Sequence, residues 1–335
     1  MERIGWIDIV RGAAFLMVIF DHLDFDNVIV MRYFSPIYLT SFFFVSGYLY
    51  KDNSSFFEML EHRTRTLLLP FILLGSLMIV FSYFFSLTEK QIGITDAFVE
   101  LFMQYGESHI NNMWFVPSLY VYSIVFFFLL KISKNKYSLE LLSILCFIAN
   151  WLYIYCFDGV SLPWHLHVTG FACFYMFLGC IYKRREKLFA RFNNKKFLLI
   201  GIPLYFVTVT FCFEYCNSCI SFWGSPFFFD ALIITTLGIG VVICVGRNNK
   251  SVLLNYVGAN TLLYFAVHGK AMSLVNYLYE VSLKASLDSF FINNVFFNES
   301  VLIIKTICCA VLIIPFAMII NRYFPKLIGH GFKLW

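Results

Sequence analysis

The architecture of this chain follows from residues 6–22, which read Trp-Ile-Asp-Ile-Val-Arg-Gly-Ala-Ala-Phe-Leu-Met-Val-Ile-Phe-Asp-His. This run predicts a helix in which Arg11 and His22, eleven residues apart, share nearly the same azimuth with about 16 Å of rise between them. Asp8 precedes Arg11 by three residues, so these two side chains can pair on that face. Ionisable groups within a bilayer are costly and usually face a protein interior or a water-filled path. The stripe therefore predicts a functional route along this helix.

The composition of the whole chain is that of a membrane protein. Of its 335 residues, 60% are hydrophobic and only 13% are charged, and the mean hydropathy is +0.76. A soluble domain carries about 25% charged residues. We therefore predict an all-α polytopic membrane protein, folded as a single domain over residues 1–335 without an appended soluble domain. The first segment lacks a small-residue cleavage site, so we expect its helix to be retained.

Ten runs approach the length of about 20 residues that spans a bilayer. They cover residues 6–22, 34–50, 66–86, 113–130, 138–156, 165–182, 197–214, 227–246, 256–280 and 300–320. The first two are short and interrupted by polar residues, which predicts helices buried by protein. Within the longest external connection, residues 94–103 predict an amphipathic helix at the membrane interface.

The distribution of basic residues predicts the orientation. With the N-terminus in the cytoplasm, 19 of the 25 Lys and Arg residues fall in cytoplasmic segments, and only Arg32, Lys90 and Lys284 fall outside. The positive-inside rule then places both termini in the cytoplasm. The net charge of +5 is explained in the same way, because the basic residues lie between apolar runs. We therefore expect a lipid bilayer and no nucleic acid as the surroundings of this chain.

His22 is the first candidate for proton chemistry. In this orientation it lies toward the outer half of the membrane, where a neutral imidazole can accept a proton from a hydroxyl. The alternative is a histidine at a helix end that faces interfacial water. No metal site is expected, because the Cys216-x-x-Cys219 spacing lacks a second pair or a histidine cluster.

Two further segments can contribute to a site. Ser46 and Gly47 form a small pair that permits close helix packing, and a nucleophilic Ser46 would need a neighbouring base. Arg63 and Arg65 precede Pro70 on the cytoplasmic side, where the planar guanidinium suits phosphate binding. The alternative for both arginines is positive-inside anchoring.

The remaining candidates are Trp114, Tyr264 and His268. Trp114 begins the fourth predicted span, where interfacial tryptophan is common. Tyr264 and His268 lie one turn apart on one helix face, and His268 is as consistent with a hydrogen-bonded core histidine as with a site residue. Arg11, Tyr264 and Trp114 are each candidates to stabilise an oxyanion.

These segments together resemble the acyltransferase-3 family of integral membrane acyltransferases, and in particular its fucose-4-O-acetylase-like branch. The family's first helix bears an Arg, ten further residues and a His, as at Arg11 and His22. The Phe-Phe-x-Ser-Gly-Tyr run at 43–48, the basic stretch before Pro70, the Trp114 entry and the Asn-x-Leu-x-Tyr-x-x-x-His run at 260–268 occur in the family's order. The similarity covers residues 6–268.

The resemblance implies a ten-helix core that transfers an acyl group, usually acetyl from acetyl-CoA, to a hydroxyl of a carbohydrate or its lipid-linked precursor. It implies His22 as the catalytic histidine, Arg11 as its motif partner, and Arg63 and Arg65 as contacts for the CoA phosphates. Asp8, Ser46, Trp114, Tyr264 and His268 become support or substrate residues. The implied location is a bacterial inner membrane.

Two features depart from the family. The family's basic motif is usually Arg-x-x-Arg, whereas this chain has Arg63-x-Arg65, so which guanidinium contacts CoA stays open. The extracytoplasmic domain fused to some members is missing from the sequence. We therefore expect the membrane core to complete the transfer itself, as a monomer or homo-oligomer, or to hand the acyl group to a separate extracytoplasmic transferase.

A transporter or flippase for a lipid-linked saccharide is the alternative function. It also explains many helices with buried Arg and His side chains. It predicts repeat symmetry or helices broken by Gly and Pro, and neither is evident in the sequence. A receptor or scaffold would give Arg11 and His22 no reason to be buried.

Overall fold

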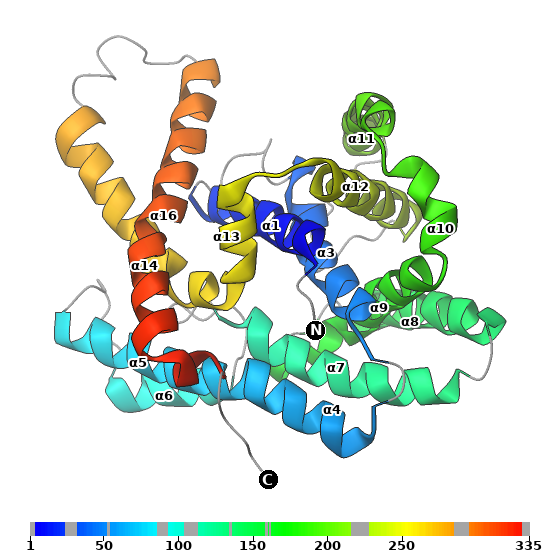
Figure 1. Cartoon of the computed structure of the whole chain (residues 1–335), viewed down its shortest axis with the longest axis horizontal. Helices are drawn as coiled ribbons and strands as arrows, with labels where there is room; N and C mark the ends of the chain where they lie inside the picture. Colours follow the sequence, from blue (N-terminus) through cyan, green and yellow to red (C-terminus); the bar gives the residue numbers. More distant parts are fainter. Residues whose placement is uncertain are drawn as a thin grey trace.

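The computed structural model describes residues 4–23, 32–51, 54–85, 93–103, 113–133, 136–157, 160, 162–215, 228–284 and 295–329. These residues form helices and connecting turns, without any strand, as Figure 1 shows. The α-helices are α1 (Gly5–Leu23), α3 (Ser35–Tyr48), α4 (Phe56–Arg63), α5 (Leu69–Phe85), α6 (Ile94–Met103), α7 (Phe115–Ile132), α8 (Lys136–Phe157), α9 (Thr169–Arg184), α10 (Glu186–Phe189), α11 (Lys195–Tyr215), α12 (Phe228–Asn248), α13 (Val252–Ala259), α14 (Thr261–Tyr279) and α16 (Val295–Tyr323). Short π or 3₁₀ segments are η1 (Thr64–Leu68), η2 (Pro163–Val168), η3 (Ala190–Phe192), η4 (Glu280–Lys284) and η5 (Pro325–Ile328).

Each of the ten predicted spans contains a helix, but fewer helices meet the requirements of a membrane span. By length and composition, six stretches of the described chain can cross a membrane, or seven if the bent pair of α12 and α13 counts as one span. α3 has only 14 residues, about 21 Å of helix against a hydrocarbon core of about 30 Å. α1 carries Asp8, Arg11 and Asp21. The all-helical membrane fold is confirmed, whereas the count of ten spans stays a prediction.

α1 is a central helix that other helices surround. It packs against α3, α12, α13, α14 and α16, and Figure 1 shows it in the middle of the view between α13 and α12. Phe15 and Ile19 are fully buried in its middle. In α3, every residue from Pro36 to Tyr48 is buried. Protein rather than lipid therefore surrounds both helices, as their short polar-interrupted sequences predict.

α13 crosses α1 with direct backbone contact. A Cβ atom on Gly12 would overlap the carbonyl group of Leu254, and a Cβ atom on Gly258 would overlap that of Asp8. The chain reaches this position through a bend of 116° between α12 and α13. It then breaks again at Asn260 before α14 starts. The prediction of one continuous helix over 256–280 is therefore wrong, because residues 252–259 pack across α1 as a separate helix.

α3 and α9 approach each other in the same way. A Cβ atom on Gly47 would overlap the carbonyl group of Met176, and one on Gly179 would overlap that of Phe44. The Ser46-Gly47 pair thus lies at a close helix contact. This is the packing role that small residues have in membrane helices.

The basic stretch lies inside a continuous helical segment. The predicted third span, 66–86, starts earlier, because α4, η1 and α5 form one uninterrupted stretch over Phe56–Phe84. η1 is a π-helical turn that contains Arg65, and such turns occur frequently at functional sites. The predicted helix over 94–103 is confirmed as α6, which buries Ala97 and Leu101 and packs against α5.

The glycine crossing generates a stability prediction. We expect Gly258→Ala to destabilise the protein, because the new methyl group must displace the α1 backbone at Asp8. Overpacking of this kind costs roughly 1–3 kcal/mol or more. The measurement is the thermal unfolding midpoint of the detergent-solubilised protein. Gly240→Ala is the matched control, since a Cβ atom there meets nothing within 4 Å, and equal midpoints for the two variants would contradict the prediction.

Candidate functional site

The C-terminal end of α1, which carries His22, brings two histidines together. The rings of His22 on α1 and His268 on α14 lie with their centroids 5.6 Å apart and their planes at 71°. His268 is only 1% exposed, whereas His22 keeps 22% of its side chain accessible. The sequence singled out both residues but did not predict that they meet. His22 can therefore be approached by a ligand while His268 supports it from inside the protein.

The hydrogen bonds of His268 determine its tautomer. Its Nδ1 lies 3.1 Å from the backbone carbonyl oxygens of both Tyr264 and Phe265. A carbonyl oxygen can only accept, so Nδ1 must carry the proton and donate. In the neutral ring Nε2 then holds the lone pair, and this atom is buried without a hydrogen-bond partner among the described residues. His268 thus presents a buried basic nitrogen next to His22.

A carboxylate and a phenol lie near His22. Tyr38 on α3 donates its hydroxyl proton to Oδ2 of Asp21 over 2.8 Å. The same carboxylate oxygen lies 3.9 Å from Nδ1 of His22. That distance is too long for a hydrogen bond, so Asp21 acts on His22 only through its charge. Nothing in the sequence singled out Asp21 or Tyr38.

Aromatic rings surround the two histidines. The ring of Phe15 lies 5.5 Å from that of His268 and 4.8 Å from that of Phe265. Phe265 also stacks on Phe115 at 5.3 Å and contacts Phe42 at 5.5 Å. This apolar lining excludes water from the buried side of the site, which strengthens the electrostatic interactions within it.

The structure gives Trp114 and Tyr264 supporting positions. Trp114 packs on His165 at 4.5 Å and on Phe115 at 6.0 Å, so Phe115 and Phe265 separate it from His268. Tyr264 donates its hydroxyl proton to the carbonyl oxygen of Ala310 over 2.8 Å. The phenol proton is thus already used in binding α14 to α16, which argues against Tyr264 as an oxyanion donor.

The remaining small-residue candidate, Ser46, lies at the contact of α3 with α9. It is 6% exposed, and Gly47 beside it touches the backbone of Met176. No hydrogen bond from a histidine reaches Ser46 within the described part of the chain. The structure therefore does not supply the base that a nucleophilic serine needs.

The N-terminal end of α1 gathers positive charge. Asp8, 4% exposed, pairs with Arg11 at 3.9 Å as the sequence predicts. The guanidinium of Arg63 lies over the ring of Tyr50, 5.8 Å from its centroid, and is close enough to Arg11 for the two charges to repel. Bringing two guanidiniums together is costly unless an anion joins them. This end of α1 is therefore suited to a negatively charged ligand.

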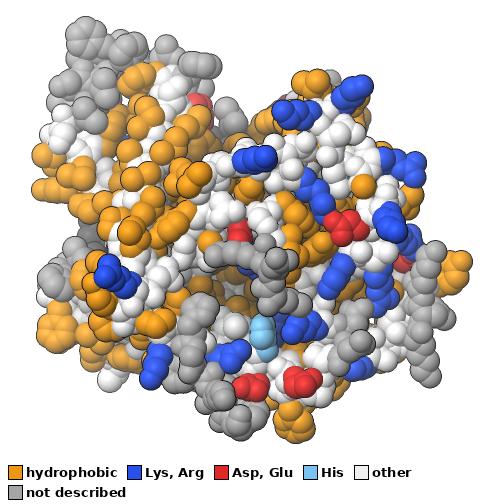
Figure 2. Space-filling view, in the orientation of Figure 1, with side chains coloured by type: hydrophobic (Ala, Val, Ile, Leu, Met, Phe, Trp, Pro, Cys, Tyr) orange, Lys and Arg blue, Asp and Glu red, His pale blue; other side chains and the backbone are white. Residues whose placement is uncertain are grey.

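A cavity of about 620 Å³ lies next to Arg63 and Arg65. Its basic and aromatic lining includes Tyr50, Lys51, His62, Arg63 and Arg65, with Glu58 and Glu61 also present. Figure 2 shows Lys and Arg side chains gathered over α4, α9, α10 and α12 on this face, whereas hydrophobic side chains dominate over α14 and α16. Both arginines of the basic stretch thus line one cavity, and either guanidinium could contact an anion bound there.

The described residues contain no group of three or more His, Cys, Asp or Glu side chains that could hold a metal ion. Cys216 and Cys219 lie outside the described residues.

Comparison with known proteins places the chain in a family. The acyltransferase-3 model, described as an acyltransferase domain, matches residues 4–322. The comparisons with curated proteins and with solved structures found no match. The family match therefore covers both ends of α1, the basic stretch and His268.

The tautomer of His268 can be tested directly. We expect ¹⁵N solid-state NMR of the protein in membranes to show a neutral His268 with a protonated Nδ1 and an unprotonated Nε2, because two carbonyl oxygens accept from Nδ1. His268→Gln, which lacks these resonances, identifies them. A spectrum with the proton on Nε2 would contradict the hydrogen-bond assignment.

Proposed function

Because this chain belongs to the acyltransferase-3 family of membrane acyltransferases, we propose that it transfers an acetyl group from cytosolic acetyl-CoA to a hydroxyl of a carbohydrate or its lipid-linked precursor. The observation that supports this most is that the two ends of α1 carry different chemical groups. One end holds a histidine pair beside a carboxylate, and the other holds a cluster of guanidiniums. The family match favours this function over the transporter alternative.

The orientation we propose puts the arginine end in the cytoplasm. Gly5 at the start of α1 and Ile328 near the end of the described chain line the same cavity, so these two positions lie at one face. The excess of Lys and Arg in the alternate connections supports a cytoplasmic location for that face. Ten spans with both termini inside are consistent with this arrangement, in a bacterial inner membrane.

Acetyl-CoA would bind at the inner end. Its phosphates carry negative charge, which Arg63 and Arg65 can bind through paired N–H donors. Arg11 lies next to Arg63 and holds Asp8, so a thioester arm that leaves the phosphates passes Arg11 and follows α1 outward. The rise from Arg11 to His22 is about 16 Å. The two residues therefore act at different points of one route rather than as a contacting pair.

His22 would act as the general base. As the acceptor oxygen attacks the thioester carbonyl, His22 takes the hydroxyl proton, the new C–O bond forms and the C–S bond breaks. The leaving thiolate then receives the proton from His22, which returns to its neutral form. The nearby Asp21 stabilises the transient imidazolium, as a carboxylate does beside a catalytic histidine. The basic Nε2 of His268 favours the same charged state.

The proposed base is tested by His22→Ala. Removal of a general base costs about 10²–10⁴ in rate, so we expect acetylation to fall by at least that lower factor. The measurement is mass spectrometry of surface glycans and of membranes supplied with acetyl-CoA, with insertion checked by gel filtration. Unchanged acetylation by correctly inserted His22→Ala would contradict the role of this residue.

The proposed donor site is tested by Arg63→Ala and Arg65→Ala. Hydrogen bonds to charged groups contribute about 1.5–3 kcal/mol, so the arginine that contacts phosphate should raise the KM for acetyl-CoA by roughly tenfold or more when removed. Arg191→Ala is the control, since Arg191 is exposed and donates only to the Leu188 carbonyl in its own turn. An unchanged KM and kcat in both test variants would indicate anchoring instead.

A further inference from the structure

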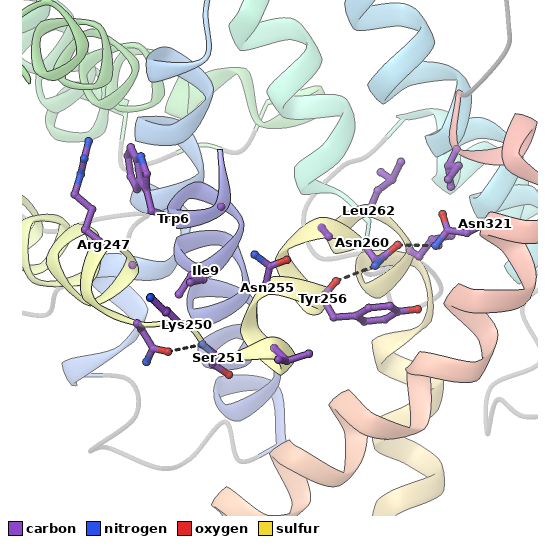
Figure 3. A pocket seen from close by; sticks show the side chains of 17 residues that line it. Trp6, Ile9, Arg247, Lys250, Ser251, Asn255, Tyr256, Asn260, Leu262 and Asn321 are labelled. Atoms are coloured by element: carbon purple, nitrogen blue, oxygen red, sulfur yellow. Dashed lines mark hydrogen bonds between the residues drawn. The ribbon is translucent and has the colours of Figure 1, made fainter. Parts of the chain in front are cut away.

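A second large cavity lies beside the start of α1. It has a volume of about 950 Å³, within the range of about 300–1,000 Å³ typical of small-molecule sites. Figure 3 shows side chains from α1, from the α12–α13 turn and from α13 arranged around it, with Asn321 of α16 at its far end. Nothing in the sequence indicated this cavity, because its walls come from three separate segments, near the start of α1, around the α12–α13 turn and at the end of α16.

Most amides of the cavity are used by the protein itself. Asn249 accepts from the backbone N–H of Ser251 over 2.7 Å. Asn260 donates to the carbonyl oxygen of Tyr256 over 2.8 Å, and Asn321 donates to Asn260 over 2.7 Å. These bonds hold the walls of the cavity in place.

Two polar side chains of the cavity are not used in this way. Lys250 is exposed and Asn255 is half-buried, and both line the cavity. Within the described part of the chain, neither side chain has a hydrogen-bond or ion-pair partner. The cavity thus offers one ammonium group and one amide with both a donor and an acceptor.

An aromatic residue borders the same space. Trp6 lines the cavity, and the guanidinium of Arg247 lies 4.3 Å from the centre of its ring. Arg247 also forms an ion pair with Glu186, so its charge is largely compensated. Trp6 is held further by an edge contact with Tyr48 at 5.1 Å. The indole is therefore fixed in place at the cavity wall.

We infer that this cavity binds the 3′-phosphoadenosine end of coenzyme A. An asparagine amide matches the adjacent donor and acceptor that adenine presents, and an indole supplies a surface for stacking a base. The free ammonium of Lys250 matches a phosphate group. This inference rests on the proposed function and deepens it, because it assigns the nucleotide of the donor to a site of its own.

The cavity and the proposed phosphate site lie on either side of the turn at η5. Ile328 lines it, and the next residue, Gly329, packs against the backbone carbonyl of Arg65, where a Cβ atom would not fit. Gly329 adopts a positive φ of 80°, a conformation that favours glycine. The turn at η5 is thus the wall that the two sites share. A nucleotide in the cavity would therefore lie close to the segment that carries Arg65.

The test compares two acetyl donors that differ in the nucleotide. We expect Asn255→Leu and Lys250→Ala each to raise the KM for acetyl-CoA about tenfold. This is the effect of losing one hydrogen bond, to adenine in the first variant and to a phosphate in the second. Neither variant should change the rate with acetyl-pantetheine, which lacks the nucleotide. Lys196→Ala is the control, because Lys196 is an exposed lysine that does not line the cavity.

Direct binding separates this inference from the proposed function. Wild-type protein in nanodiscs should bind adenosine 3′,5′-bisphosphate in calorimetry, and Asn255→Leu should weaken that binding about tenfold. Equal effects of the variants on both donors, or undiminished binding of the bisphosphate by both variants, would overturn the inference. Binding that depends on Asn255 in a protein that transfers no acetyl group would support the cavity and contradict the proposed function.

Discussion

The close crossing of α13 over α1 is the contact on which the site depends. Two backbones can touch there only because Gly12 and Gly258 lack side chains. The crossing places α13 against the buried Asp8, and α14 begins directly after α13, at Thr261. The register of that crossing therefore fixes where α14 runs along α1. His268 reaches His22 as a consequence, so a contact at the inner end of α1 determines the geometry at its outer end.

The two ends of α1 carry different charges. Burial makes each unpaired charge costly, so the partners of each charged group matter. At the inner end, Asp8 compensates one arginine, and Arg63 adds a second guanidinium near the first. At the other end, Nδ1 of His268 donates to two backbone carbonyl oxygens, and a carboxylate oxygen of Asp21 lies 3.9 Å from Nδ1 of His22. Positive charge thus gathers at one end of α1 and two imidazoles at the other. One helix can serve both because α1 is surrounded by protein along most of its length.

The sequence predicted the helical membrane fold, the buried character of α1 and α3, the α6 helix and the Asp8–Arg11 pair, because each depends on local spacing or composition. It did not predict that His22 and His268 meet, since 246 residues separate them and helix periodicity says nothing about which helices are neighbours. It also missed the division of 256–280 at Asn260, which a contact with Asp8 requires. It did not predict the role of Tyr38 or the cavity beside Trp6 either, because both depend on which helices are neighbours. The family resemblance supplied the candidate residues, but only the packing showed that they form two groups.

The separation of these groups limits what Arg11 can do. A guanidinium about 16 Å of helix rise away from His22 cannot stabilise charge that develops on an oxygen next to the imidazole, because donors must lie within about 3 Å of that oxygen. Arg11 instead pairs with the buried Asp8, and Arg63 is close enough for the two positive charges to repel. Arg11 thus compensates a carboxylate that would otherwise be buried alone, and it adds to the positive charge at this end of α1. The Arg-x10-His spacing is therefore best understood as a constraint of length. Under the proposed function, it sets the distance between the point where an acyl donor would enter and the point where its acyl group would react.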